Sequence, residues 1–269
     1  MREFFGFGGY TREPEGYMSW QHITFVTSLM IIMIALAVYL GLVYRNKESG
    51  KKNVPLIWAA FLIDGFELFK IVLMCIRGKD PLGWLYILPL FLCSIQLITI
   101  PLAAFAKGRV KEAALDFVFI FGILGAFAGT YGAGQNYACY PVLSFDNVVS
   151  GITHAISGFA SLYIAISGMA SMKKKDIPII FGILFTFCAA AMTANLTLDY
   201  NYMFLMRGDG TPYDIFYNLV NGNAVLYPIV VVLLFVVYII AFVAIYNFFK
   251  NRKTANLPKT AKIKEPETV

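Results

Sequence analysis

The chain has 269 residues, of which 59% are hydrophobic and 14% are charged, and its formal net charge is +6. Soluble domains contain about 45–50% apolar and about 25% charged residues. The mean hydropathy of +0.68 points in the same direction. This composition excludes an ordinary soluble enzyme and predicts an integral membrane protein, in which charged residues lie mainly between the apolar segments.

Seven apolar segments are long enough to cross a hydrocarbon core of about 30 Å, which takes about 20 helical residues. In chain order they are Ile23 to Tyr44, Val54 to Ile76, Trp84 to Ala106, Ala113 to Gly132, Val148 to Ala170, Ile177 to Leu198 and Ala224 to Phe249. A spanning helix satisfies its own backbone hydrogen bonds. The sequence therefore predicts an all-α fold, with a seven-helix transmembrane bundle over residues 23–249.

Lys and Arg residues are unevenly distributed between alternate loops. One side of the predicted membrane carries sixteen of them, in the loops after the first, third and fifth spans and in the tail from Lys250. The other side carries five, namely Arg2, Arg12, Arg77, Lys79 and Arg207. Because Lys and Arg favour cytoplasmic loops, we expect a multi-pass protein of the cell membrane with its N-terminus outside and its C-terminus in the cytoplasm. The basic charge then reports topology, and no nucleic-acid partner is expected.

Two polar segments flank the predicted bundle. Residues 1–22 form an outer N-terminal segment without the apolar core and cleavage site of a signal peptide, and residues 250–269 form a basic cytoplasmic tail. The chain has no phosphate-binding glycine loop, no CxxC motif and no metal-ligand spacing around its two histidines. We therefore expect no cofactor and no metal. The oligomeric state stays open.

The second predicted span reads "IDGFELFK" and places Asp64, Glu67 and Lys70 at successive spacings of three residues. Residues three apart share a face of a helix. Ionisable side chains within a membrane are expensive and usually functional. At a rise of about 1.5 Å per residue, the row runs from about 9 Å below the outer end of the span, at Lys70, to about 18 Å, at Asp64.

Other polar residues fall at a similar predicted depth in the outer half. Cys93 of "LPLFLCS" lies about 13 Å below the outer end of the third span, and His154 of "GITHAISG" lies about 9 Å down the fifth. We therefore expect one pocket open toward the outer leaflet, lined by Asp64, Glu67, Cys93, Gln96, His154, Asn195, Asn201 and Tyr202. The alternative is structural: a buried Glu67–Lys70 ion pair, with Gln96 and Asn195 as hydrogen-bonding contacts between helices.

Two further cysteines, Cys75 and Cys139, fall on the predicted outer side. They could bridge in an oxidising compartment, but two cysteines on one side of a membrane are weak support for a disulfide without geometry.

Several segments resemble a known family. "LPLFLCS", His154, "ANLTLDYNYMFLMRGDGTPYDIFYNL" and "GNAVLYP" are similar to the YwaF family of bacterial multi-pass membrane proteins, over roughly Trp20 to Phe249. That family is similar in turn to a eukaryotic transmembrane acyltransferase family that remodels ether phospholipids with a helix-borne cysteine and a histidine. The resemblance implies that Cys93 and His154 are a catalytic pair and that membrane lipids are the partners.

Two functions of different class follow from these residues. In the first, an acyltransferase or lipid hydrolase, His154 takes the proton of Cys93, Asp64 or Glu67 orients the imidazole, and Asn195, Asn201 or Tyr202 donates hydrogen bonds to the oxyanion. In the second, a carrier or sensor, the buried Asp64, Glu67, Lys70 and His154 bind a polar solute or relay protons.

Overall fold

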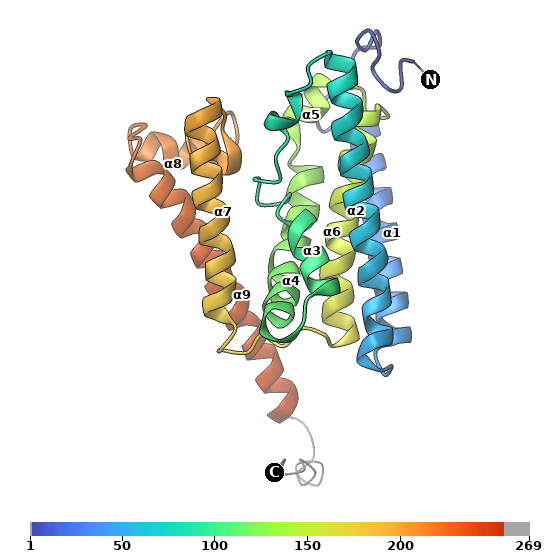
Figure 1. Ribbon diagram of the computed structural model, residues 1–269, viewed down its shortest axis with the longest axis vertical. Helices are drawn as coiled ribbons and strands as arrows, with labels where there is room; N and C mark the ends of the chain where they lie inside the picture. Colours follow the sequence, from blue (N-terminus) through green and yellow to red (C-terminus); the bar gives the residue numbers. More distant parts are fainter. Residues whose placement is uncertain (1, 256–269) are drawn as a thin grey trace.

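Eleven helical elements follow one another in the computed structural model, which describes residues 2–255 (Figure 1). They are α1 (Trp20–Tyr44), α2 (Ser49–Gly78), the 3-10 helix η1 (Gly83–Tyr86), α3 (Gln96–Phe105), α4 (Gly108–Tyr131), α5 (Gly134–Cys139), α6 (Phe145–Ser167), α7 (Ile177–Leu198), the 3-10 helix η2 (Tyr202–Phe204), α8 (Asp214–Leu219) and α9 (Leu226–Ala255). Residues 2–255 contain no strand, so the all-α prediction is confirmed for this part of the chain. The predicted tail after Ala255 lies outside the described residues.

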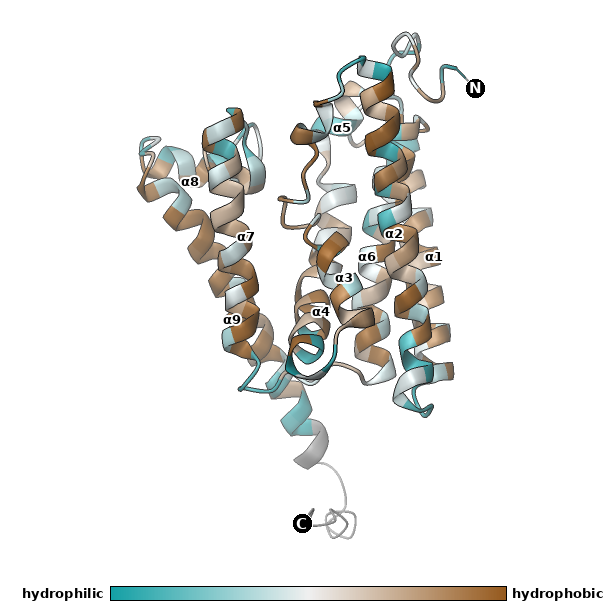
Figure 2. Cartoon of the chain, in the orientation of Figure 1, coloured by the Kyte–Doolittle hydropathy of each residue, from teal (hydrophilic) through white to brown (hydrophobic). Residues whose placement is uncertain are grey.

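Long helices occupy six of the seven predicted spans: α1, α2, α4, α6, α7 and α9. Within the described residues, four helices are long and apolar enough to cross a membrane by length and composition, namely α1, α6, α7 and the part of α9 from Leu226 to Arg252. Brown, apolar residues predominate along α7 and α9 in Figure 2, and large apolar side chains such as Ile31, Leu196 and Leu233 are exposed on α1, α7 and α9. This exposed apolar surface indicates a membrane protein, because a soluble protein rarely exposes apolar patches of such extent.

Helix α6 lies at the centre of the main bundle and packs against α1, α2 and α4. Close approach depends on small residues at two of these contacts. A Cβ at Gly41 of α1 would lie 2.7 Å from Ile166 Cγ2, and one at Gly122 of α4 would lie 2.6 Å from the carbonyl oxygen of Ser157. Glycine at such positions lets helix backbones approach closely, as is common between membrane helices.

The basic loops gather at one end of the molecule. The α1–α2, α3–α4 and α6–α7 connections lie at the end toward which α9 runs, whereas the N-terminal segment, α5 and α8 lie at the opposite end (Figure 1). Teal, hydrophilic residues mark the basic connections in Figure 2. The alternation of loops that the charge pattern predicts is therefore present in the fold.

The third predicted span, Trp84 to Ala106, is wrong as a continuous helix. Its first half contains only η1 and an irregular segment, and α3 begins at Gln96. Pro89 explains the break, because proline lacks the backbone N–H and disfavours the helical conformation of the residue before it. Cys93 therefore precedes α3 instead of lying within a helix, and a depth counted from helical rise does not apply to it.

A tyrosine from a distant part of the chain supports this irregular segment. The N–H of Leu88 donates to the hydroxyl oxygen of Tyr202 at 3.2 Å, and that hydroxyl donates to the carbonyl oxygen of Leu85 at 2.5 Å. Non-helical backbone at membrane depth is tolerated where it is buried in protein with its polar groups satisfied. Tyr202 is fully buried and supplies that partner.

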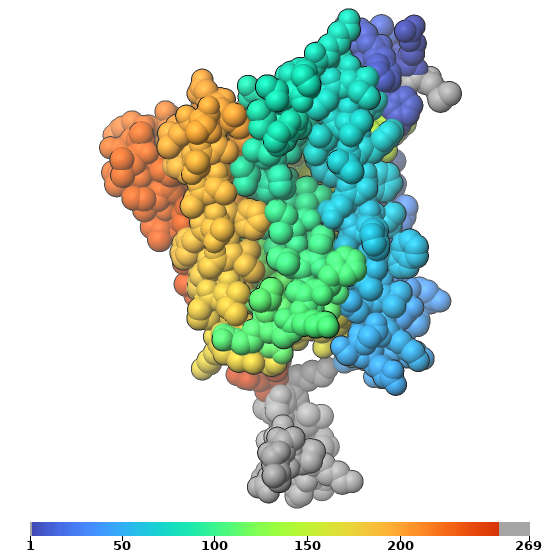
Figure 3. All heavy atoms as spheres, in the orientation of Figure 1, coloured from blue at the N-terminus to red at the C-terminus, as the bar shows by residue number. Residues whose placement is uncertain are grey.

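Helices α7 and α9 form a second layer beside α4, with an apolar core between them. Phe117 and Phe121 of α4, Leu184 of α7 and Phe235 of α9 belong to this core. The irregular segment joins it through Leu90 and Ile95. Figure 3 shows α7, in yellow to orange, directly beside the green surface of residues 90–110. The segment that carries Cys93 is thus clamped between the main bundle and the second layer.

All four cysteines are free, including Cys75 near the end of α2 and the exposed Cys139. The disulfide considered from the sequence is not formed.

Candidate functional site

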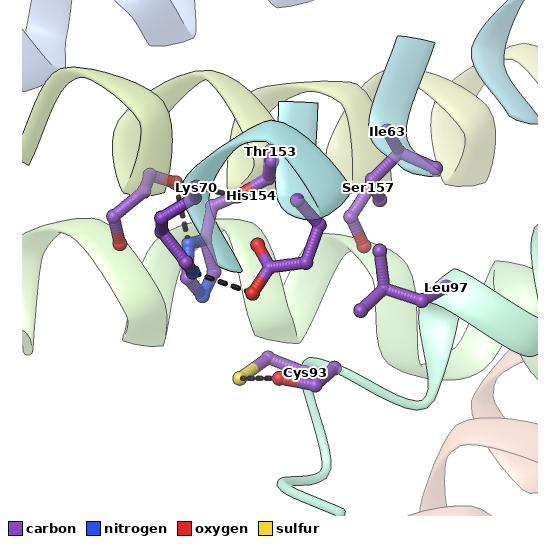
Figure 4. A pocket seen from close by; sticks show the side chains of 10 residues that line it. Ile63, Lys70, Cys93, Leu97, Thr153, His154 and Ser157 are labelled. Atoms are coloured by element: carbon purple, nitrogen blue, oxygen red, sulfur yellow. Dashed lines mark hydrogen bonds and ion pairs between the residues drawn. The ribbon is translucent and has the colours of Figure 1, made fainter. Parts of the chain in front are cut away.

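A small polar cavity of about 50 Å³ lies where α2, α6 and the start of α3 meet. Its lining comes from three parts of the chain: Ile63, Glu67 and Lys70 of α2; Cys93, Ser94 and Leu97 around the start of α3; and Ser150, Thr153, His154 and Ser157 of α6 (Figure 4). A cavity needs about 10–15 Å³ to hold one water molecule, so this one has room for a few waters or one small polar group.

His154 has a defined hydrogen bond on one side of its ring. Its Nδ1 lies 2.7 Å from the carbonyl oxygen of Ser150, one turn earlier on α6 (Figure 4). A carbonyl oxygen only accepts, so Nδ1 carries the proton and the Nε2 of the neutral ring has a free lone pair. The backbone of α6 therefore selects the tautomer in which Nε2 can act as a base.

Cys93 is partly buried and lines the same cavity as His154. The thiol and the imidazole lie near enough to interact electrostatically. Ser94 Oγ lies 4.0 Å from the sulfur. The backbone N–H groups of Cys93 and Ser94 have no backbone acceptor within the described residues, as expected just ahead of the first turn of a helix. The start of α3 thus presents a thiol together with free donors.

An ion pair lines the cavity on the α2 side. Lys70 Nζ lies 2.5 Å from Glu67 Oε1, with side-chain exposures of 17% and 11% (Figure 4). The ion pair expected in the structural alternative is therefore formed, but it joins two residues of one helix and holds no pair of helices together. A pair three residues apart on a helix stabilises it by only about 0.2–0.5 kcal/mol.

Two predicted pocket residues near the cavity are not part of its lining. Asp64 lies one turn before Glu67 on α2 and is partly buried. Gln96 is fully buried in the first turn of α3, where its Oε1 accepts from the Thr99 hydroxyl at 3.1 Å. Its Nε2 has no partner within the described residues.

Three predicted residues, Asn195 in the last turn of α7 and Asn201 and Tyr202 in the loop after it, serve a local purpose and do not line the cavity. Asn195 Nδ2 donates to the carbonyl oxygen of Tyr202 at 3.0 Å, and the N–H of Tyr202 donates to Asn195 Oδ1 at 2.6 Å. Asn201 Nδ2 donates to the carbonyl oxygen of Arg207 and to Asp209 Oδ2, both at 2.7 Å. Buried backbone groups need such partners. These amides hold the loop in shape.

Sequence reasoning missed several residues of the lining. Ser150, Thr153 and Ser157 flank His154 at spacings of four, one and three residues. Residues three and four apart share one face of a helix, so helical periodicity applied outward from His154 identifies Ser150 and Ser157. Thr153 lies three residues after Ser150 and four before Ser157, so the same periodicity applied to those two serines identifies it.

The sequence matches a known family over most of its length. A sequence model of the TMEM164 family matches residues 17–254. The chain belongs to the TMEM164 family. No curated protein and no solved structure matches it. The match supports a membrane protein, in agreement with the apolar helices of this TMEM164-family chain. The matched model describes the whole family and does not distinguish a bacterial YwaF type.

The N-terminal segment of this TMEM164-family chain, most of which precedes the matched region, is fastened over the end of α2 and α6. Arg77 of α2 forms a two-bond ion pair with Asp146 of α6, at 2.7 and 2.9 Å. Tyr10 donates its hydroxyl to Asp146 Oδ2 at 2.5 Å. Burial, followed by this hydrogen bond to a carboxylate, raises the pKa of Tyr10 to about 12. Asp146 lies one turn before Ser150, so the N-terminal segment covers the end of the bundle nearest the cavity.

Proposed function

We propose that this membrane protein is a lipid acyltransferase or lipid hydrolase that uses Cys93 as nucleophile and His154 as base. The observation that carries the proposal is the placement of both side chains in one cavity, with Nδ1 of His154 bonded to the Ser150 carbonyl. Cysteine enzymes need a base beside the thiol and a third group that orients the base. Here the Ser150 carbonyl supplies the orientation that the sequence assigned to Asp64 or Glu67.

The reaction follows from the tautomer. Nε2 of His154 takes the thiol proton, and the sulfur attacks the ester carbonyl of a membrane lipid. When the tetrahedral intermediate collapses, the C–O bond breaks, the imidazolium returns the proton to the leaving alcohol, and a thioester remains on Cys93. The hydroxyl of a second lipid, or water, then attacks the thioester carbonyl and loses its proton to Nε2. The C–S bond breaks, and the imidazolium proton goes to the thiolate to restore the thiol.

The start of α3 supports stabilisation of the oxyanion. The N–H groups of Cys93 and Ser94 have no backbone acceptor, and the N-terminus of a helix favours negative charge. Free donors of this kind, aimed at the developing oxygen charge, are the usual basis of an oxyanion hole. They replace Asn195, Asn201 and Tyr202, whose polar groups already have hydrogen-bond partners elsewhere in the protein.

Labelling with a lipid-like electrophile tests this proposal. The full-length protein in vesicles is treated with a cysteine-reactive electrophile on a long alkyl chain, such as an N-alkyl chloroacetamide. The modified cysteines are then identified by peptide mass spectrometry. We expect labelling at Cys93, none after Cys93→Ala, and labelling slowed by about 10²–10⁴ after His154→Ala. Cys75, Cys139 and Cys188 are free thiols in the same chain and serve as internal controls. Equal reactivity of all four would overturn the proposal.

A carrier or sensor of a polar solute is the alternative, and the Glu67–Lys70 pair in the same cavity favours it. Comparative lipidomics of cells that contain the wild type, Cys93→Ser or Glu67→Gln separates the two. Acyl exchange predicts a changed lipid profile with Cys93→Ser. A carrier predicts an unchanged lipid profile with Cys93→Ser and a loss of phenotype with Glu67→Gln.

We also propose that the chain is a YwaF-type bacterial protein of the cell membrane, that it crosses the membrane seven times, and that the end with the basic loops faces the cytoplasm. The uneven distribution of Lys and Arg supports this orientation. Impermeant maleimide tests it on single-cysteine variants. The exposed native Cys139 is expected to react in intact cells, and Lys174→Cys, on the opposite side, only after permeabilisation. Reaction of both in intact cells contradicts this map.

A further inference from the structure

Helix α4 lies behind the cavity and contributes none of its lining side chains. Toward α6 and the Cys93 segment it carries Gly122, Gly125 and Gly129. None of the three has a positive φ, so the backbone conformation does not require glycine. Glycine within a helix also lowers its stability relative to alanine. The reason for each glycine therefore lies in what packs against it.

Gly129 lies directly against the imidazole of His154. A Cβ at this position would lie 1.9 Å from Cδ2 and 2.0 Å from Nε2 of the ring, far inside van der Waals contact. The ring thus occupies the space that a side chain at position 129 would fill. Its Nδ1 is fixed on the other side by the Ser150 carbonyl. The hydrogen bond sets the tautomer, and the bare backbone at Gly129 sets how close the ring lies to α4.

The other two glycines meet different neighbours. A Cβ at Gly125 would lie 3.4 Å from Cys93 Cβ, which is ordinary contact. A Cβ at Gly122 would lie 2.6 Å from the Ser157 carbonyl oxygen and 2.8 Å from Ser161 Cβ, so it would separate α4 from α6. Only at Gly129 are the three nearest atoms all in the ring of His154.

We propose that Gly129 is a positioning residue for His154: it provides the space in which the imidazole holds Nε2 toward Cys93. The inference rests on the proposed function, because it assigns the glycine to the base of that reaction. A larger residue at 129 must push the ring away from α4, and Nδ1 is then drawn away from the Ser150 carbonyl. The nucleophile loses its base although no lining residue has changed.

Thermal unfolding in detergent tests the contact independently of the chemistry. We compare Gly129→Ala, His154→Ala and the double variant with Gly122→Ala and its own double variant with His154→Ala. Removing the ring removes the clash at 129, so Gly129→Ala should lower the unfolding temperature in the wild type but not in the His154→Ala background. Gly122→Ala should lower it equally in both backgrounds, because its clash is with α6. This design remains informative if Gly129→Ala alone fails to fold, since the double variant is expected to fold.

Labelling of Cys93 across pH tests the positioning role. We expect Gly129→Ala to slow labelling at least about tenfold at neutral pH, the scale of a displaced general base. Its rate should then rise with pH as steeply as that of His154→Ala, because hydroxide replaces the imidazole. Gly125→Ala should stay close to the wild type. A folding defect alone lowers the amount of labelled protein without changing the shape of the pH profile.

The outcomes separate the two proposals. Wild-type labelling and pH profile in folded Gly129→Ala, or equal destabilisation by Gly129→Ala with and without the ring, overturns the role of Gly129 and leaves the proposed function intact. In the remaining case, Gly129→Ala lowers the unfolding temperature only when the His154 ring is present, as expected, while Cys93 of the wild type does not react. The packing contact is then real, but the catalytic roles of Cys93 and His154 and the positioning role of Gly129 are all wrong.

Discussion

At the end of α7 and in the loop after it, buried amides are hydrogen-bonded to the chain's own backbone, whereas polar side chains line an open cavity between α2, α6 and the start of α3. Both amide groups of Asn195 and Asn201 have backbone partners within eight residues. In the cavity, neither Nε2 of His154 nor the thiol of Cys93 has a backbone partner in another residue of the described part of the chain, and both side chains line the same small volume. Buried polarity therefore indicates a site only where its hydrogen-bonding capacity is not used locally.

The largest stability effect is expected at Asn195, in the last turn of α7. Asn195→Leu keeps a similar size but leaves the N–H of Tyr202 without an acceptor and removes one of the two donors to the Tyr202 carbonyl, which still accepts from the Leu205 N–H. A buried unsatisfied group costs about 1–3 kcal/mol and a lost hydrogen bond about 1 kcal/mol, so we expect a loss of about 2–4 kcal/mol in the free energy of unfolding. Thermal unfolding in detergent measures it.

Cys93 should still react in the Asn195→Leu variant below its unfolding temperature, because the amide does not line the cavity. Thr193→Val, an exposed position on the same helix, is the matched control and should be nearly neutral. If Asn195→Leu instead left stability unchanged and stopped labelling of Cys93, the distinction between the two regions would be wrong.

A smaller effect is expected at the residue that connects the two regions. Tyr202→Phe removes the hydroxyl that accepts from the Leu88 N–H and donates to the Leu85 carbonyl. We expect the free energy of unfolding to fall by about 1–3 kcal/mol, because the buried N–H of Leu88 and carbonyl of Leu85 lose their partner. Amide exchange at residues 85–93 should become faster, since the segment that carries Cys93 is then held less firmly.

Tyr200→Phe is the control for this experiment, because its hydroxyl makes no hydrogen bond within the described residues while its ring packs against that of Tyr202 at 4.7 Å. Equal amide exchange in the two variants would show that the hydroxyl of Tyr202 does not support the irregular segment.

Hydropathy and charge were sufficient for most of the fold. Six predicted spans are helices within a few residues of their predicted limits, because each needs only its own apolar run to insert. The third span could not be predicted in this way. Pro89 is visible in the sequence, but the partner that makes a broken segment tolerable, Tyr202, lies 114 residues after Leu88. Contacts at such separation follow from tertiary packing, which local patterns do not contain.

The candidate site was predicted in part for the same reason. Glu67, Cys93 and His154 share the cavity, whereas Asn195, Asn201 and Tyr202 were grouped with them only by predicted depth. Depth does not say which way a side chain points, and it does not reveal that a nearby backbone group will take up its polar atoms. The role of the Ser150 carbonyl was also hidden, since any residue type presents the same carbonyl to the position four residues later.

The smallest effect is expected at the N-terminal segment. Tyr10→Phe removes one hydrogen bond to Asp146 while the Arg77–Asp146 pair remains, so we expect a loss of about 1 kcal/mol at neutral pH. The pKa of Tyr10 is raised to about 12 from an ordinary value near 10, and a raised pKa means that folding favours the protonated hydroxyl. This contribution is complete below about pH 10 and is lost as the pH rises toward about 12. The stability difference between the wild type and Tyr10→Phe should therefore shrink over that range, as measured by thermal unfolding in detergent at a series of pH values.

Tyr39→Phe, at an exposed position of α1, is the control, and its stability difference from the wild type should not change over this pH range. A difference that persists unchanged to pH 12 would mean that the Tyr10 hydroxyl does not fasten the segment, and that packing of Phe4 and Phe5 against Phe145 holds it instead.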